Sequence, residues 1–270
     1  MPTVVGEIRA DVGQAVRPGT VLAQLGSPDF GQAQSDAARA LSDLRLEAPV
    51  EPSKYLAIGL NYKDHVAEAR QIGFQVPDSQ VWFNKQVSCI NAPYGDVHKP
   101  GFSDMVDYEA ELGVVIGRRC HRIGADEARR VVAGYLVCND VSVRDWQRRS
   151  PTMQLGKSFN THGPIGPWIV TADEIADPHA LEIRMAINGE LRQRASTGQM
   201  IHDIWQQIAY LSTVMTLEPG DVIATGTPAG VAAMHQPPAW LTPGATVNVE
   251  VEGFGRLSNP VLRGEPFLDR

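Results

Sequence analysis

Two glutamates stand one residue apart in a segment that is otherwise largely apolar. Glu109 and Glu111 lie in the stretch Val-Asp-Tyr-Glu-Ala-Glu-Leu-Gly-Val-Val-Ile-Gly at 106–117. Residues 109–116 are expected to form a strand, and side chains at i and i+2 of a strand leave the same face. Adjacent carboxylates repel, so they must be solvated, share a proton or bind a cation, and hard oxygen ligands favour Mg²⁺, Mn²⁺ or Ca²⁺ over zinc. A solvated edge strand is the alternative that this pair alone leaves open.

A third carboxylate follows a second apolar stretch. Residues 134–139 are expected to form a strand that ends at Asp140, and residues 141–147 are expected to begin a helix. Asp140 either joins the two glutamates or caps that helix. Arg144 and Gln147 are three residues apart on one face of the expected helix, where they are suited to holding a substrate carboxylate or carbonyl oxygen.

His65 and Glu68 are the residues best suited to proton transfer. They follow the apolar run at 55–60, in a segment that is expected to start a helix. The i, i+3 spacing places the two side chains together, and a carboxylate in that position orients an imidazole and raises its basicity. The pair therefore either activates water or is an ordinary exposed His–Glu pair.

Two loops rich in glycine and proline carry the remaining polar groups. Residues 156–167 contain Lys157 but lack the order of a phosphate-binding loop, so Lys157 is interpreted as a positive group for an enolate or oxyanion, with a surface lysine as the alternative. Residues 225–230 follow an expected strand at 221–224. The hydroxyl of Thr227 and the loop amides either line a pocket or form a simple turn.

The elements that must position these side chains are mostly strands. Apolar residues alternate at 183–187 before Asn188-Gly189, and again at 247–251 before a turn at 253–255, which predicts two hairpins. Residues 201–215 show the apolar spacing of one helix. We therefore predict a β-rich α+β fold with mixed or antiparallel sheet.

Prolines at 49 and 52 mark a predicted boundary. We expect a small N-terminal module at 1–48, with strands at 3–8 and 21–25 and a helix at about 36–44, and a catalytic metal-binding domain at 49–270. The three cysteines form no Cys-x-x-Cys pair and are expected to be reduced core thiols.

Composition narrows the classes of function. The chain has 270 residues and a net charge of −7, so it lacks the positive field that nucleic-acid binding needs. No apolar run approaches the roughly 20 residues of a membrane helix, and the first residues do not resemble a secretory signal, which favours a cytoplasmic protein with no membrane partner. No Gly-x-Ser-x-Gly motif is present, and the histidines show no zinc-site spacing.

Five ordered segments, at 58–68, 107–112, 139–147, 156–159 and 225–230, together resemble the fumarylacetoacetate hydrolase family. The resemblance extends from about residue 50 to the C-terminus. It implies the mixed β-sheet catalytic domain of that family, a homodimer, and a divalent cation, Mg²⁺ or Mn²⁺, with Ca²⁺ also compatible. A mobile lid at about 69–81 is also expected from it.

The resemblance also implies roles for individual residues. The implied metal ligands are Glu109, Glu111 and Asp140. His65, oriented by Glu68, is the implied base that activates water, and Lys157 the cation that stabilises developing negative charge. Contacts with the substrate are implied for Arg144, Gln147 and Thr227.

These roles predict an enzyme acting on a small 2-oxo acid. The favoured reaction is hydrolysis of a carbon–carbon bond in a 2,4-dioxo acid of the acylpyruvate or fumarylpyruvate type, because hydrolysis needs the His65–Glu68 base whereas decarboxylation does not. An isomerase, a hydratase or an oxaloacetate-type decarboxylase at the same metal site is the alternative. A binding protein that has kept the fold is a third hypothesis, for which the first 45 or so residues, which do not match the family, are the only hint.

Overall fold

The computed structural model describes residues 5–8, 23–25 and 45–264. Residues 5–8 and 23–25 form two short antiparallel strands, β1 (Val5–Ile8) and β2 (Ala23–Leu25), inside the segments predicted to be strands. The helix predicted at about 36–44 lies outside the described residues. The predicted domain boundary at residue 48 stays a prediction.

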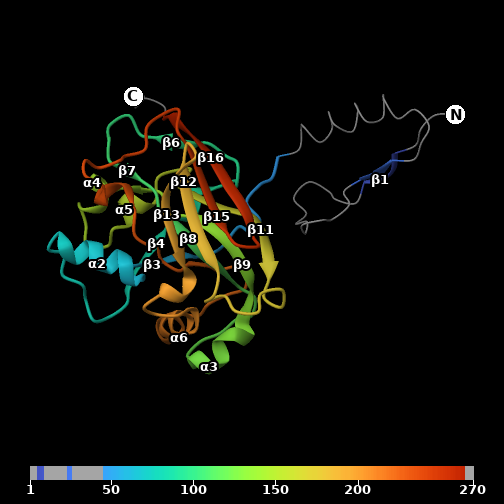
Figure 1. Ribbon diagram of the computed structural model, residues 1–270. Coiled ribbons are helices and arrows are strands. Elements are labelled where there is room, and N and C mark those ends of the chain that lie inside the picture. Colours follow the sequence, from blue (N-terminus) through green and yellow to red (C-terminus); the bar gives the residue numbers. More distant parts are fainter. Residues whose placement is uncertain (1–4, 9–22, 26–44, 265–270) are drawn as a thin grey trace, which may run out of the picture.

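Two β-sheets dominate the described part of the chain, which confirms the predicted β-rich α+β class (Figure 1). The larger, mixed sheet has the order β4-β3-β14-β8-β9-β11-β5, and the smaller has the order β13-β12-β15-β16-β6. The strands of the larger sheet are β3 (Tyr55–Gly59), β4 (Val81–Lys85), β5 (Ile90–Asn91), β8 (Ala110–Ile116), β9 (Val132–Asn139), β11 (Gly163–Thr171) and β14 (Val222–Ala224). Those of the smaller sheet are β6 (Val97–Lys99), β12 (Glu182–Ile187), β13 (Glu190–Ser196), β15 (Thr246–Val251) and β16 (Gly255–Arg263).

Both predicted hairpins are present. β12 and β13 pair across Asn188-Gly189, where both residues have positive φ, as a two-residue hairpin turn requires. β15 and β16 pair across the turn at 252–254. The helix predicted at 201–215 is α6 (Ile204–Val214), which begins at a capping box formed by Asp203 and Gln206.

Short helices lie at two places around the sheets (Figure 1). One group comprises α2 (Lys63–Gln71), α4 (Arg144–Gln147) and α5 (Gln154–Lys157), together with the small pair β7 (Val106–Asp107) and β10 (Ser142–Val143). α3 (Ala125–Ala128) packs against α6 at one end of the molecule. Single 3-10 turns complete the described elements: η1 (Val87–Cys89), η2 (Arg129–Val131), η3 (Thr197–Gln199) and η4 (Ala232–Met234). No helix among the described residues is long and apolar enough to cross a membrane.

The core is divided by the larger sheet into two clusters. Leu112 and Val114 of β8 point into the main cluster, together with Ile183 and Val249 of the smaller sheet, so this cluster fills the space between the sheets. Val115 of β8 points the other way, into a second cluster with other side chains of β3, β4 and β9. Cys89, Cys120 and Cys138 are buried free thiols, as predicted.

Candidate active site

The alternation of β8 decides where its two glutamates point. Glu109 and Glu111 have the same parity as Val115, so they leave the face of the larger sheet that is turned away from the smaller sheet. Glu111 lies opposite Cys138 of β9, and the backbone N–H of Asp140 donates to the carbonyl oxygen of Glu109. This register brings Asp140, just beyond the end of β9, to the same place.

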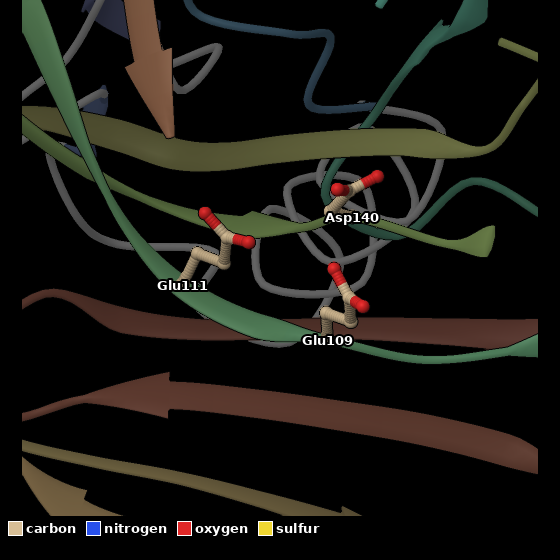
Figure 2. Close-up of side chains that lie close together, drawn as sticks. All are labelled: Glu109, Glu111 and Asp140. Carbon is tan, nitrogen blue, oxygen red and sulfur yellow. The ribbon is translucent and has the colours of Figure 1, made fainter. Parts of the chain in front are cut away.

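The three carboxylates converge, as Figure 2 shows. One oxygen from each of Glu109, Glu111 and Asp140 lies within 4.8 Å of the other two, and all three residues are buried. Oxygen ligands about 2.1 Å from an octahedral ion stand about 3.0 to 4.2 Å apart. The spacing therefore fits one Mg²⁺ or Mn²⁺ after a small movement of the side chains, and the all-carboxylate donor set fits such a hard ion.

Asp140 is not the cap of the helix that follows it. The expectation of a helix from residue 141 is wrong, because residues 142–143 form β10 by pairing with β7. The helix starts at Arg144, with Val143 at its N-cap. Of the two interpretations of Asp140, the cap is therefore excluded.

Three buried cations surround these carboxylates. Lys157 Nζ lies 2.6 Å from Glu109 Oε2 and 2.7 Å from Asp140 Oδ2. Lys85 Nζ lies 2.5 Å from Asp140 Oδ1. Arg144 donates from Nη2 to Glu109 Oε1 at 2.6 Å. Both oxygens of Glu109 and of Asp140 are thus already paired with cationic side chains.

Arg144 is also fixed from its other side. Its Nε donates to Asp107 Oδ2 at 2.7 Å, and its Nη1 donates to Gln147 Oε1 at 2.9 Å. Asp107 further accepts the backbone N–H groups of Ala232 at 2.6 Å and Ala233 at 3.1 Å. Arg144 is therefore an internal ion-pair partner that ties β7, α4 and η4 together, in addition to lying beside the carboxylates.

Acids outnumber bases by one in this buried set. The four carboxyl groups belong to Asp107, Glu109, Glu111 and Asp140, and the three cations to Lys85, Arg144 and Lys157. Burial alone would raise the pKa of Glu109, but the Lys157 ammonium, the Arg144 guanidinium and, more weakly, His65 hold it at about 2. Burial and the neighbouring Asp140 and Glu109 raise the pKa of Glu111 well above its usual value. Glu111 thus carries the surplus negative charge, which a proton or a cation has to neutralise.

Glycine makes the backbone support of Glu111 possible. The N–H of Gly226 donates to Glu111 Oε2 at 2.7 Å. Gly226 has a φ of +98°, and a Cβ at this position would lie 2.7 Å from the Cβ of Asn61. A residue with a side chain is strained there and displaces the amide from the carboxylate.

The His65–Glu68 pair forms as predicted, on α2. His65 Nδ1 lies 3.5 Å from Glu68 Oε2, longer than a hydrogen bond of about 2.9 Å. Such loose geometry is common for catalytic bases without bound substrate. The Glu68 carboxylate accepts the N–H of Gly230 at 3.2 Å, which anchors it to the loop after β14. The side chain of His65 is 11% exposed and that of Glu68 is 28% exposed, so the pair is open to solvent on the Glu68 side.

The two predicted loops are in part regular structure. Lys157 ends the one-turn helix α5, and residues 163–167 belong to β11 rather than to a loop. Lys157 is nearly fully buried, which excludes the alternative of a surface lysine. Residues 225–230 form a loop after β14, where Thr227 Oγ1 accepts a hydrogen bond from Gln193 Nε2 at 2.9 Å. α2 ends at Gln71, so only the first part of the segment expected to be a lid is helical.

Two further residues of this site were not predicted from the sequence. Lys85 follows Phe83 at strand spacing, so the period of two along β4 placed it on the buried face, and this signal was available. Gln193 sits in a polar strand, β13, where nothing in the sequence marks it. It donates to Thr227 and to the Pro228 carbonyl, and its Oε1 accepts the N–H of Ala110.

Comparisons with known proteins show the family to which the chain belongs. The model of the fumarylacetoacetate (FAA) hydrolase C-terminal region matches residues 54–262. The chain belongs to the fumarylacetoacetate hydrolase family. Its members are enzymes, hydrolases and isomerases among them, and this family membership together with the three-carboxylate cluster supports a divalent-metal site.

Relatives within the family carry different names. A fumarylacetoacetate hydrolase domain-containing protein 2 homolog from Dictyostelium discoideum is 42% identical, over 82% of this chain and 75% of its own length. A structure of a 5-carboxymethyl-2-hydroxymuconate delta-isomerase from Mycobacterium smegmatis is 42% identical with a TM-score of 0.73, covering 83% of this chain and 84% of that one. A fumarylacetoacetate hydrolase from Exiguobacterium antarcticum is 38% identical with a TM-score of 0.74, covering 80% and 78%.

Proposed function

We propose that this protein is a divalent-metal-dependent hydrolase that cleaves a carbon–carbon bond of a 2,4-dioxo acid. The observation that carries the proposal is the His65–Glu68 pair, which is open to solvent and lies within electrostatic reach of the three-carboxylate cluster. A decarboxylase has no need of a base that activates water, and a hydrolase does. The base therefore favours hydrolysis over decarboxylation, and an assay with a muconate-type substrate separates hydrolysis from isomerisation.

The residues of the chain divide the work. Glu109, Glu111 and Asp140 would hold the metal, and Mg²⁺ or Mn²⁺ bound there would supply a Lewis acid that polarises the substrate. His65 takes a proton from water, and Glu68 stabilises the imidazolium that forms. Lys157 has its ammonium beside the same carboxylates, where it stabilises negative charge that develops on the substrate.

The reaction balances with water as the only co-substrate. The oxygen of water adds to C4 of R–CO–CH₂–CO–COO⁻, and the C3–C4 bond breaks. Its electron pair moves to C3 as the enolate of pyruvate, which takes up a proton at C3. The products are R–COO⁻ and pyruvate, with one proton released. The free hydrogens of Arg144, the amide of Gln147 and the hydroxyl of Thr227 are the groups we assign to holding the substrate.

The deciding experiment follows acetylpyruvate with metal-stripped protein, with and without added Mg²⁺ or Mn²⁺. Loss of the dioxo chromophore is recorded, and pyruvate and acetate are assayed separately. Formation of both products in equal amounts, only with metal, is the expected result. His65→Gln should then lower kcat by about 10²- to 10⁴-fold.

Three results would contradict the proposal. No products from acetylpyruvate, together with metal-dependent decarboxylation of oxaloacetate, would assign a lyase. Full activity of His65→Gln would remove the base from the mechanism even if acetylpyruvate were cleaved. Isomerisation of a muconate-type substrate without cleavage would assign the isomerase reaction for which one of the structural relatives is named.

A further inference from the structure

A solvent-open cavity of about 530 Å³ lies between the end of α2 and residues 233–238, which include the end of η4. Its walls are formed by Ile72, Ala233, Met234, His235, Gln236, Pro237 and Pro238. This volume lies within the range of about 300 to 1,000 Å³ that is typical of small-molecule sites. None of the residues assigned above to the metal or to proton transfer lines it.

One wall of the cavity is connected to the His65–Glu68 pair through α2. His65 and Glu68 lie on α2, and Ile72 is the C-cap residue that directly follows it, at i, i+3 and i+7, so the three side chains leave the same side of the chain. Four residues from Glu68 to Ile72 correspond to about 6 Å along the helix axis. Ile72, which lines the cavity, is therefore about one turn beyond the pair.

The opposite wall is tied to the same pair through Gly230. The N–H of Gly230 donates to Glu68, and the carbonyl oxygen of Gly230 lies 3.2 Å from His235 Nε2. A carbonyl oxygen only accepts hydrogen bonds, so Nε2 carries the hydrogen and the ring of His235 is held in place. The two backbone groups of this one residue thus join the base pair to the cavity wall.

The chemistry of the walls selects what can bind. Five of the seven lining residues are Ile, Ala, Met and Pro, and neither Lys nor Arg is among the seven. A carboxylate placed against these walls gains no cationic partner to offset the hydration that it loses there. An alkyl or aryl group gains from burial against these walls.

Resting on the proposed hydrolase function, we propose that this cavity is the subsite for the group R of R–CO–CH₂–CO–COO⁻. The enzyme then prefers 2,4-dioxo acids with an apolar acyl group of several carbons over acetylpyruvate, and over substrates that end in a second carboxylate. Ile72 and Met234 are the specificity-determining residues, because they contribute apolar side chains from the two opposite walls.

Binding to Mg²⁺-loaded protein tests the subsite without any need for turnover. Titration calorimetry compares 2-oxopentanoate, 2-oxooctanoate and 2-oxooctanedioate, which differ only beyond the fourth carbon. We expect 2-oxooctanoate to bind roughly 10- to 50-fold more tightly than 2-oxopentanoate, and more tightly than the diacid. Equal affinities, no binding of either monoacid, or tighter binding of the diacid would overturn the inference.

Ile72 and Phe74 offer a matched pair of variants. Both side chains are more than half exposed, so neither Ile72→Asp nor Phe74→Asp removes core packing, but only Ile72 lines the cavity. Ile72→Asp should reduce the preference for 2-oxooctanoate to less than about threefold, whereas Phe74→Asp should keep it. Ile72→Arg should shift the preference toward 2-oxooctanedioate. Equal loss of preference in the two Asp variants contradicts the assignment of the cavity.

The experiments distinguish a failure of the proposed hydrolysis from a failure of the proposed subsite. If acetylpyruvate is not cleaved but 2-oxooctanoate binds more tightly than 2-oxopentanoate in an Ile72-dependent way, the hydrolysis is wrong and the subsite stands. If acetylpyruvate is cleaved with metal but hexanoylpyruvate shows no higher kcat/KM, the hydrolysis stands and the subsite is wrong.

Discussion

The ammonium group of Lys157 lies 2.6 Å from Glu109 Oε2, on a carboxylate that also belongs to the candidate metal site. The same ammonium lies 2.7 Å from Asp140. Lys157 and a metal ion are therefore alternative cations for two of the three carboxylates. Metal binding has to weaken at least one of these ion pairs.

Lys157→Met should consequently bind metal more tightly while losing activity. Removing the buried ammonium removes its repulsion of an incoming divalent ion, so we expect Mn²⁺ affinity to rise at least about tenfold. Turnover should fall, because the group assigned to stabilise negative charge is gone. Calorimetric titration with Mn²⁺ measures the affinity, and Lys99→Met, which removes a surface ion pair with Asp104, is the control. Unchanged or weaker Mn²⁺ binding would show that Lys157 does not compete with the ion.

Glu109 and Glu111 should respond differently to the same change. In the metal-free protein, burial and the neighbouring Asp140 and Glu109 raise the pKa of Glu111, which favours its uncharged form, and Glu111→Gln puts an uncharged group of the same shape in its place. Glu109 is ionised and paired with Lys157 and Arg144, so Glu109→Gln breaks buried ion pairs at a cost of about 3–5 kcal/mol. Urea unfolding in EDTA should show a large loss of stability for Glu109→Gln and less than about 1 kcal/mol for Glu111→Gln.

The affinity for Mn²⁺, unlike the stability, should fall by a similar factor in Glu109→Gln and Glu111→Gln. Both lose a carboxylate ligand, and we expect Mn²⁺ affinity to fall at least about 100-fold in each. A Glu111→Gln variant that binds Mn²⁺ normally would remove Glu111 from the ligand set. Equal destabilisation of the two variants in EDTA would contradict the assigned protonation of Glu111.

The two glutamates could be paired from a local rule, whereas the place of Asp140 was left open by the residues and was implied only by the resemblance to the family. The period of two through Glu109 and β8 places Glu109 and Glu111 together, and the pairing of β8 with β9, which is not local, brings Asp140 next to them. The same period of two placed Lys85 on the buried face of β4, but no sequence motif indicated that it belongs to the site. Gln193 comes from the other sheet, and its bond to Thr227 depends on how the two sheets pack, which no local pattern specifies.

The short elements were the least predictable. The sequence at 141–147 predicts a helix, but the pairing of β10 with β7 overrides this local preference. The helix therefore begins at Arg144. The buried hydrogen bond from Arg144 to Asp107 was not predictable either, because it joins residues that are distant in sequence and meet only when β7 pairs with β10. The hairpin at Asn188-Gly189 was predictable, because its turn residues alone define it.

Acid should destabilise the protein partly through His162. Burial lowers the pKa of this histidine from 6.5 to about 4. Its Nε2 lies 2.9 Å from the carbonyl oxygen of His98 and so carries the hydrogen, while its buried Nδ1 has no partner to accept a hydrogen bond from it once protonated. Between pH 6.5 and 4 the unfolded chain therefore binds a proton that the folded chain does not, and stability falls as pH falls.

The size of this effect is measurable by difference. The shift corresponds to about 3 kcal/mol lost between pH 7 and pH 4. His162→Gln keeps a side-chain donor near His98 but does not titrate, so its stability should fall less over this range. Urea unfolding of both proteins at pH 7.0, 5.5 and 4.5 provides the comparison. Parallel losses in the two proteins would mean that His162 is not responsible for the slope.

Alanine variants of Gly226 and Gly189 distinguish the effect of backbone strain from the effect of losing a hydrogen bond in the site. Both have positive φ, +98° and +82°, so alanine at either position is strained by roughly 1 kcal/mol. A Cβ at Gly189 meets nothing within 4 Å, whereas at Gly226 it meets Asn61 at 2.7 Å and displaces the amide that donates to Glu111. We expect Gly226→Ala to weaken Mn²⁺ binding about tenfold or more, because the carboxylate loses the hydrogen bond that orients it. Gly189→Ala should lose only the roughly 1 kcal/mol of stability that comes from backbone strain. It should bind Mn²⁺ with the affinity of the unchanged protein. Calorimetric titration of both variants with Mn²⁺ decides the point, and equal affinities would mean that the Gly226 amide does not position Glu111.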